Sequence, residues 1–101
     1  MPPTPLAYVI MLDEPGRQMG LRWLENLRDR HPTMRLFADC QGGSLKSQLR
    51  RADKSGADFA LLIGAEEAAA ARATLKNLKS GGQEQLDFDG LDNRLASAAP
   101  A

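Results

Sequence analysis

The residues best suited to ligand binding gather around one predicted helix and the strand after it, in the segment QGGSLKSQLRRADKSGADFALLIG from Gln41 to Gly64. An apolar stripe of Leu45, Leu49 and Ala52 recurs at helical spacing along this segment. Four basic residues are predicted on the opposite arc of the helix: Lys46, Arg50, Arg51 and Lys54. Such a row can hold the phosphates of a nucleic acid, but the solvated face of an ordinary amphipathic helix has the same pattern.

Polar groups at the two ends of this unit could also contact a ligand. Ser44 is placed to cap the helix, and Gln41 with the backbone N–H groups of residues 42–44 could bind a phosphate or a base edge. Glu66 and Glu67 follow the predicted buried strand, and ligands of open α/β sheets bind beyond the carboxyl ends of the strands. Glu67 also has a purely structural interpretation, because a carboxylate is favoured near a helix N-terminus.

The remaining reactive side chains predict neither catalysis nor metal binding. Cys40 is the single cysteine, which excludes an internal disulfide and a multi-cysteine metal site and favours a reducing, cytoplasmic setting. His31 is the single histidine and has no cysteine partner with which to hold zinc. Trp23 falls on the apolar face of a predicted helix and is expected in the core. We therefore expect no cofactor in this chain.

The elements that must position these residues alternate as they do in α/β proteins. The patterns predict, in chain order, a strand at 7–12, a helix ending at 31, a strand at 34–38, a helix at 44–56, a strand at 59–63, a helical turn at 66–71, strands at 71–77 and 83–88, and a short helix beginning at 91. Helical crossovers make the first three strands parallel, whereas hairpin pairing makes the fourth antiparallel to its neighbours. The prediction is an α/β fold with a mixed sheet.

Length and charge limit the classes of protein that fit. A chain of 101 residues suits one domain, which we expect at 6–96 between an extended proline-rich entry at 1–5 and a frayed tail at 97–101. Basic and acidic residues number 13 each, so the net charge gives no indication of nucleic-acid binding. No apolar stretch approaches the roughly 20 residues of a membrane span and no signal peptide is recognisable, so we expect a cytoplasmic chain without membrane contact.

The segment from Gly42 to Gln83 resembles the C-terminal anticodon-binding domain of bacterial histidyl-tRNA synthetases, which are class IIa enzymes. The similarity rests on ordered pieces with matching spacings: GGSLKSQ, RRADKSGA, FALLIG, the glutamate three residues past its glycine (Glu67) and the hairpin TLKNLKSGGQ. The resemblance implies a three-layer α/β/α fold with a five-stranded mixed sheet and an antiparallel fourth strand. Many family members have a glycine where this chain has Ala71, and an acidic residue where it has Ala65.

The resemblance also implies anticodon recognition rather than catalysis by this chain. Glu67 and Lys76 match positions at which related synthetases contact anticodon bases, while the basic arc could hold the RNA backbone. The implied partner is the anticodon stem-loop of histidine tRNA, and not DNA. The class II motifs cannot fit in this chain, so ATP and Mg would be bound by the catalytic domain of a parent histidine–tRNA ligase, expected to be a homodimer.

Two other interpretations stay open from the sequence. The first is a stand-alone relative of the synthetases that kept the fold as a protein-docking or dimer-forming module; it would bind a protein partner without base preference. The second is a thioredoxin-like redox domain, since the order of strands and helices is similar. Cys40 without a second cysteine argues against it, because that chemistry uses a pair of cysteines at a helix N-terminus.

Overall fold

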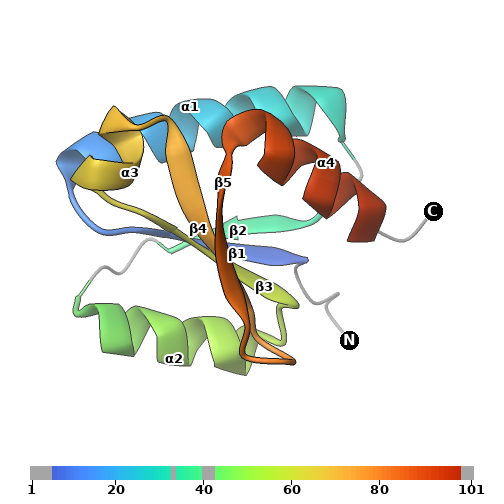
Figure 1. Cartoon of the computed structure of the whole chain (residues 1–101). Coiled ribbons are helices and arrows are strands. Elements are labelled where there is room, and N and C mark those ends of the chain that lie inside the picture. The colour runs from blue at the N-terminus through green and yellow to red at the C-terminus, as the bar shows by residue number, and fades with distance from the viewer. Residues whose placement is uncertain (1–5, 33, 40–42, 99–101) are drawn as a thin grey trace.

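The computed structural model describes residues 6–32, 34–39 and 43–98, which form a five-stranded sheet between two layers of helices (Figure 1). The elements are β1 (Ala7–Met11), α1 (Glu14–Arg30), β2 (Leu36–Ala38), α2 (Leu45–Ser55), β3 (Phe59–Ile63), α3 (Ala65–Ala69), β4 (Arg72–Asn77), β5 (Gln83–Asp87) and α4 (Phe88–Ala98). The strand order is β2-β1-β3-β4-β5, with β1 parallel to β2 and β3, and β4 antiparallel to β3 and β5. The predicted three-layer fold with an antiparallel fourth strand is confirmed.

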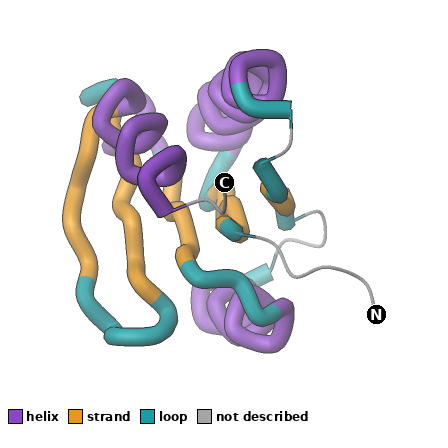
Figure 2. Tube along the Cα trace, turned by 90° about the vertical axis from the view of Figure 1, so that its right-hand side faces the viewer, coloured by secondary structure: helices purple, strands orange, loops and turns teal. Residues whose placement is uncertain are grey.

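The two layers of helices differ in how much of the sheet they cover. Helices α1 and α4 lie on one face with α3 beside the start of α1, whereas α2 lies alone on the other face (Figures 1 and 2). The turn of the β4–β5 hairpin curls down beside α2 in both views. Because a single helix covers this second face, polar side chains of β4 stay accessible next to it.

Each layer has its own apolar core. The larger cluster joins α1 and α4 to the sheet and contains fully buried residues such as Leu27, Leu61 and Leu91. Trp23 is 5% exposed within it, and its indole N–H donates to Asp92 Oδ1 at 3.0 Å, so the predicted core position is confirmed. The smaller cluster lies under α2 and is built around Tyr8, Ile10, Ala52, Ala57 and Ala60.

The predicted apolar stripe of α2 is partly wrong. Leu45 is 41% exposed, and the buried polar residue of this helix is Gln48, which is 3% exposed. Burial of Gln48 is tolerated because its amide donates to the Gly43 carbonyl at 3.0 Å, and a buried amide with a partner costs little. The sequence pattern put Leu45 on the buried face of the first turn because it assumes that a polar residue such as Gln48 faces solvent.

The last helix begins earlier than its apolar residues indicate. We predicted its start at Leu91, but α4 begins at Phe88, directly after β5. Asp87 caps the helix, because its Oδ1 accepts the Gly90 N–H at 2.7 Å. The helix extends into the predicted tail and ends at Ala98. The expectation for residues 99–101, like that for the entry at 1–5, lies outside the described residues.

Candidate nucleic-acid interface

A shallow groove of about 380 Å³ separates α2 from the β4–β5 hairpin. We call it the α2–hairpin groove, and its lining residues are Lys46, Leu49, Arg50, Asp53, Lys76, Asn77, Leu78 and Gly81. The register explains why β4 contributes here. Lys76 lies directly opposite Ala60 on β3, and Ala60 packs under α2, so alternation along the strand directs Lys76 to the same face.

Three cations meet in this groove, and the structure leaves them available for a ligand. Lys46 and Arg50 lie one turn apart on α2, and Lys76 faces them from β4. Within residues 6–32, 34–39 and 43–98, none of the three forms an ion pair or a side-chain hydrogen bond. Lys54, the next residue of the same row, is exposed but does not line the groove.

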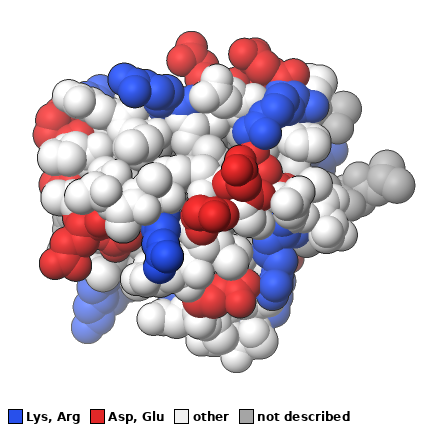
Figure 3. Space-filling view, turned by 45° about the horizontal axis from the view of Figure 1, so that its top comes forward, with Lys and Arg blue, Asp and Glu red and all other residues white. Residues whose placement is uncertain are grey.

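In the layer of α1 and α4, several charged side chains form ion pairs within the molecule. Arg30 of α1 pairs with Asp92 of α4, and Arg94 of α4 pairs with Glu84 of β5 at 3.1 Å. On the face that these helices form, acidic and basic side chains are interspersed (Figure 3). A polyanion therefore finds a local excess of unpaired positive charge beside α2 and not over α1 and α4.

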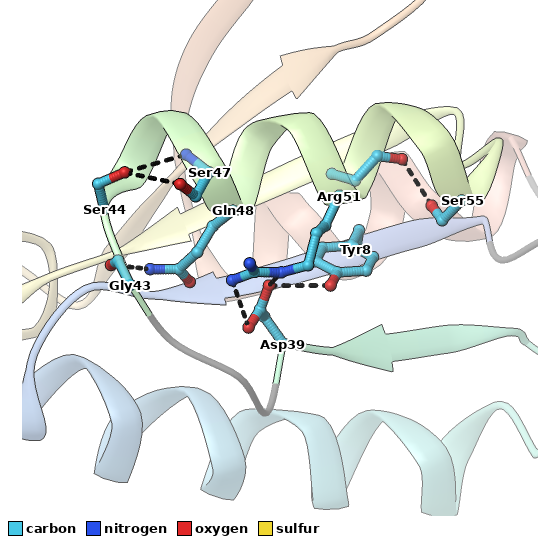
Figure 4. Close-up of polar contacts among 9 residues, drawn as sticks. Tyr8, Asp39, Gly43, Ser44, Ser47, Gln48, Arg51 and Ser55 are labelled. Atoms are coloured by element: carbon cyan, nitrogen blue, oxygen red, sulfur yellow. Dashed lines mark hydrogen bonds and ion pairs between the residues drawn. The ribbon is translucent and has the colours of Figure 1, made fainter.

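Arg51 does not belong to the basic row in which we predicted it. Its guanidinium points to the sheet and binds Asp39 with two bonds, Nε to Oδ2 at 2.9 Å and Nη2 to Oδ1 at 3.2 Å (Figure 4). The Asp39 side chain is fully buried, and it also accepts the Tyr8 hydroxyl at 2.9 Å. Arg51 lies a quarter turn from Arg50, on the flank of the helix, which is why adjacent arginines face different surroundings.

This network shifts the pKa values of two members. Burial, followed by the hydrogen bond to Asp39 and the charge of that carboxylate, raises the pKa of the Tyr8 hydroxyl above its usual 10.0. The hydrogen bond to Asp39 raises the pKa of the Arg51 guanidinium further above its already high ordinary value. Arg51 is therefore a charged structural residue that joins α2 to the end of β2, and not a free contact for phosphate.

At the N-terminus of α2, Ser44 acts as the predicted cap. Its Oγ accepts the Ser47 N–H at 3.2 Å, and it lies 3.0 Å from the Ser47 hydroxyl. The cap explains the presence of a serine here, because the first-turn N–H groups need an acceptor. Gln41, the other residue predicted at this end, lies outside the described residues.

Glu67 lies at the other end of the sheet from Lys76. Lys76 is paired with Ala60 near the start of β3, whereas Glu67 lies on α3, beyond the end of β3. A short connection joins β3 to β4, but Lys76 does not come near Glu67 at that end, because the antiparallel β4 runs back along β3 before it reaches Lys76. The two residues could contact one RNA only at separate points.

The half-buried Glu67 carboxylate lies over Gly64, where an added Cβ would be 3.4 Å from Oε2. Asp13 fixes this corner of the molecule. Its Oδ2 accepts the Ala65 N–H at 2.9 Å, while its Oδ1 accepts the Gly16 N–H at 2.9 Å and caps α1. One carboxylate thus joins the N-termini of α1 and α3 at the carboxyl ends of β1 and β3, where open α/β sheets bind ligands. The sequence holds a signal for this role that the helix pattern alone does not use, because an aspartate directly before a Glu-Pro helix start is a cap signal.

The comparisons with known proteins agree with this geometry. A family model described as "Anticodon binding domain" matches residues 7–97. Histidyl-tRNA synthetase from Nostoc sp. PCC 7120 superposes with a TM-score of 0.84 and 26% identity over 95% of this chain. Histidyl-tRNA synthetase from S. aureus gives 0.79 and 23% over 91%, and the RNA binding domain of threonyl-tRNA synthetase from Cryptosporidium parvum Iowa II gives 0.82 and 21% over 92%.

The chain belongs to the anticodon-binding domain family and has the fold of the anticodon-binding domains of class II aminoacyl-tRNA synthetases. It spans 23% of the length of each of these three solved chains. In the part of the chain that the structure describes, no helix is both long and apolar enough to cross a membrane. The same ranges hold no group of three His, Cys, Asp or Glu side chains placed to bind a metal ion.

Proposed function

We propose that this chain binds the anticodon stem-loop of histidine tRNA, as the anticodon-binding domain of a histidine–tRNA ligase. The observation that carries the proposal is the match to the anticodon-binding family over residues 7–97. The Nostoc histidyl-tRNA synthetase, at 26% identity over 95% of the chain, favours histidine as the amino acid. The threonyl enzyme shares the fold at 21% identity and gives no support for threonine specificity.

In this proposal the domain supplies specificity and not catalysis. The cations of the α2–hairpin groove hold phosphates, and this contact is independent of base sequence. Glu67 recognises a base, because its carboxylate accepts from base N–H groups, and a wrong base that covers the carboxylate leaves this acceptor unmatched. Ser44, the N-cap of α2, would contact the RNA backbone, and we propose the same role for Gln41.

The parent enzyme would supply everything else. A catalytic domain on the rest of the polypeptide would join histidine to the tRNA with ATP and Mg, in a cytoplasmic homodimer. Our chain would need no cofactor of its own. A tRNA bound by the catalytic domain would be held close to the tethered anticodon-binding domain. This raises the effective concentration of the anticodon loop there, so a modest affinity of the isolated domain is sufficient.

A binding titration tests the proposal. The chain is titrated with the histidine anticodon stem-loop and with the same stem-loop carrying a changed middle anticodon base. We expect tighter binding of the histidine loop, by about fivefold or more if one base contact of at least 1 kcal/mol is lost. Equal affinity for the two loops would contradict anticodon recognition by this domain, and binding of neither would contradict RNA binding altogether.

Glu67→Gln identifies the residue responsible. The amide keeps the shape of the side chain but replaces one acceptor oxygen by a donor, so we expect the preference between loops to change more than the total affinity. Glu66→Gln is the matched control, because it removes the same charge from the adjacent, exposed position of α3. An unchanged preference in Glu67→Gln would show that base recognition lies elsewhere.

A further inference from the structure

We propose that the α2–hairpin groove is a guanine-binding subsite, in which the carboxylate of Asp53 accepts hydrogen bonds from the Watson–Crick edge of the base. The inference rests on the proposed RNA-binding function and deepens it. It assigns base recognition to a second point, at the opposite end of the sheet from Glu67. The groove would then bind a nucleotide as a unit, with Asp53 contacting the base and the cations contacting phosphate.

The fold itself gives no reason for a carboxylate at position 53. Asp53 lies in the last turn of α2, where the helix dipole disfavours negative charge. Its side chain is exposed, and in the described part of the chain it forms neither an ion pair nor a hydrogen bond. It nevertheless lines the groove that also holds Lys46, Arg50 and Lys76. Those cations lower the cost of partly desolvating the carboxylate when a base covers it.

The remaining lining suits the flat face of a base. Leu49 of α2 and Leu78, which follows β4, are half-buried and pack against the smaller apolar cluster. They form an apolar wall within a lining that otherwise carries charged and polar groups. A volume of about 380 Å³ lies within the range of small-ligand sites.

The hairpin side of the groove is held in place before any ligand binds. Asn77 Oδ1 accepts the N–H groups of Lys79 and Ser80 at 2.9 and 3.0 Å, and the Leu78 N–H donates to the Asp58 carbonyl at 2.9 Å. These bonds fix Leu78 relative to the start of β3. A preorganised wall reduces the ordering cost of binding.

Guanine is the base that matches a single carboxylate. Its Watson–Crick edge presents two adjacent donors, N1–H and N2–H, which two carboxylate oxygens can accept together. Adenine presents an acceptor at N1, which would face the carboxylate and be repelled. Inosine keeps the N1–H but lacks the amino group, so it should bind with an affinity between those of guanine and adenine.

The first test uses RNA. Stem-loops in which a loop guanine is replaced by inosine or by adenine are titrated against the wild type, Asp53→Asn and Asp29→Asn. Asp29 is the matched control, because it is an exposed aspartate in the last turn of α1, on the other layer. We expect a loss of about fivefold or more for adenine in the wild type and in Asp29→Asn, and near-equal affinity for the three loops in Asp53→Asn. The same guanine preference in Asp53→Asn as in the wild type would overturn the proposal.

The second test is independent of the stem-loop. Guanosine, inosine and adenosine 5′-monophosphates are titrated into the ¹⁵N-labelled chain, and amide shifts are followed. We expect affinity in that order, with shifts at Asp53, Asn77 and Leu78 that are lost in Asp53→Asn. Equal affinities, shifts elsewhere or no binding of guanosine monophosphate would overturn the guanine site. Failure of the proposed function has a different result, because it either abolishes binding of every stem-loop or leaves the histidine loop and the loop with a changed middle base equal in affinity.

Discussion

Arg50 and Arg51 are adjacent in the chain and have the same charge, yet the structure gives them different roles. Arg50 lines the α2–hairpin groove and has no partner in the described residues. Arg51 binds the buried Asp39 carboxylate with both Nε and Nη2. Helical spacing alone put both arginines on one arc. A sequence pattern cannot show which side of a helix faces a buried carboxylate such as that of Asp39, which follows β2.

Single substitutions should separate the two arginines. Arg50→Ala should weaken binding of any RNA hairpin about equally and reduce the slope of log affinity against log salt by about 1, with a change in unfolding free energy within about 0.5 kcal/mol. Arg51→Ala should lower stability clearly more than Arg50→Ala does, because it leaves the Asp39 carboxylate without its guanidinium partner. Urea unfolding and salt-dependent RNA titrations measure both effects. Equal stability losses in the two variants would contradict the assignment.

Tyr8 gives the network a pH signature. Burial and Asp39 raise the pKa of its hydroxyl, so the folded chain keeps the phenol proton at pH values where the unfolded chain loses it. The stabilising contribution is complete below pH 10.0 and is lost as the pH rises through the higher pKa of the folded state. Tyr8 is the single tyrosine, so tyrosinate absorbance reports on it alone. We expect the Tyr8 hydroxyl of the folded chain to titrate with a midpoint above pH 10.0. The substitution Tyr8→Phe should make the fall of the unfolding free energy at alkaline pH less steep. A Tyr8 midpoint at or below 10.0 would contradict this account.

At the scale of elements, the sequence predicted most of the order and missed details that long-range contacts decide. The strands β1 and β3 were evident because uncharged runs such as FALLI suit a strand covered on both faces. The start of α4 was placed too late because Asp87 works as a cap only where β5 ends. The orientation of Gln48 was missed because its partner, the Gly43 carbonyl, lies before the helix.

The connection between α3 and β4 carries local strain. Ala71 has a φ of 54° and is the one non-glycine residue with positive φ in the described chain. A Cβ disfavours this left-handed conformation by about 1–2 kcal/mol, so Ala71→Gly should stabilise the domain by up to about 1 kcal/mol after the entropic cost of glycine. Ala69→Gly, within α3, is the control and should destabilise by about 0.5–1 kcal/mol. Urea midpoints compare the two, and a loss of stability in Ala71→Gly would show that the strain is absent.

At the scale of the whole molecule, the sheet has two unequal sides. On the side of α1 and α4, acidic and basic side chains are interspersed (Figure 3), and some of them pair, as Arg94 and Glu84 do. The side of α2 is covered by one helix, and in the described residues the groove cations Lys46, Arg50 and Lys76 have no ion-pair partner. A neutral total charge concealed this difference, and the groove was not predictable because it forms only when the hairpin turn lies beside α2.

The central claim is that RNA contacts α2, the β4–β5 hairpin and the carboxyl end of β3 near Glu67, and an amide-shift map of the ¹⁵N-labelled chain with the histidine anticodon stem-loop tests it most directly. The account predicts shifts along the outward face of α2, at residues 76–78 of β4 and the hairpin, and around Gly64 and Glu67, while the solvent-facing residues of α1 and α4 change little. A map centred on α1 and α4, or one that leaves residues 46–53 and 76–78 unaffected, would contradict it.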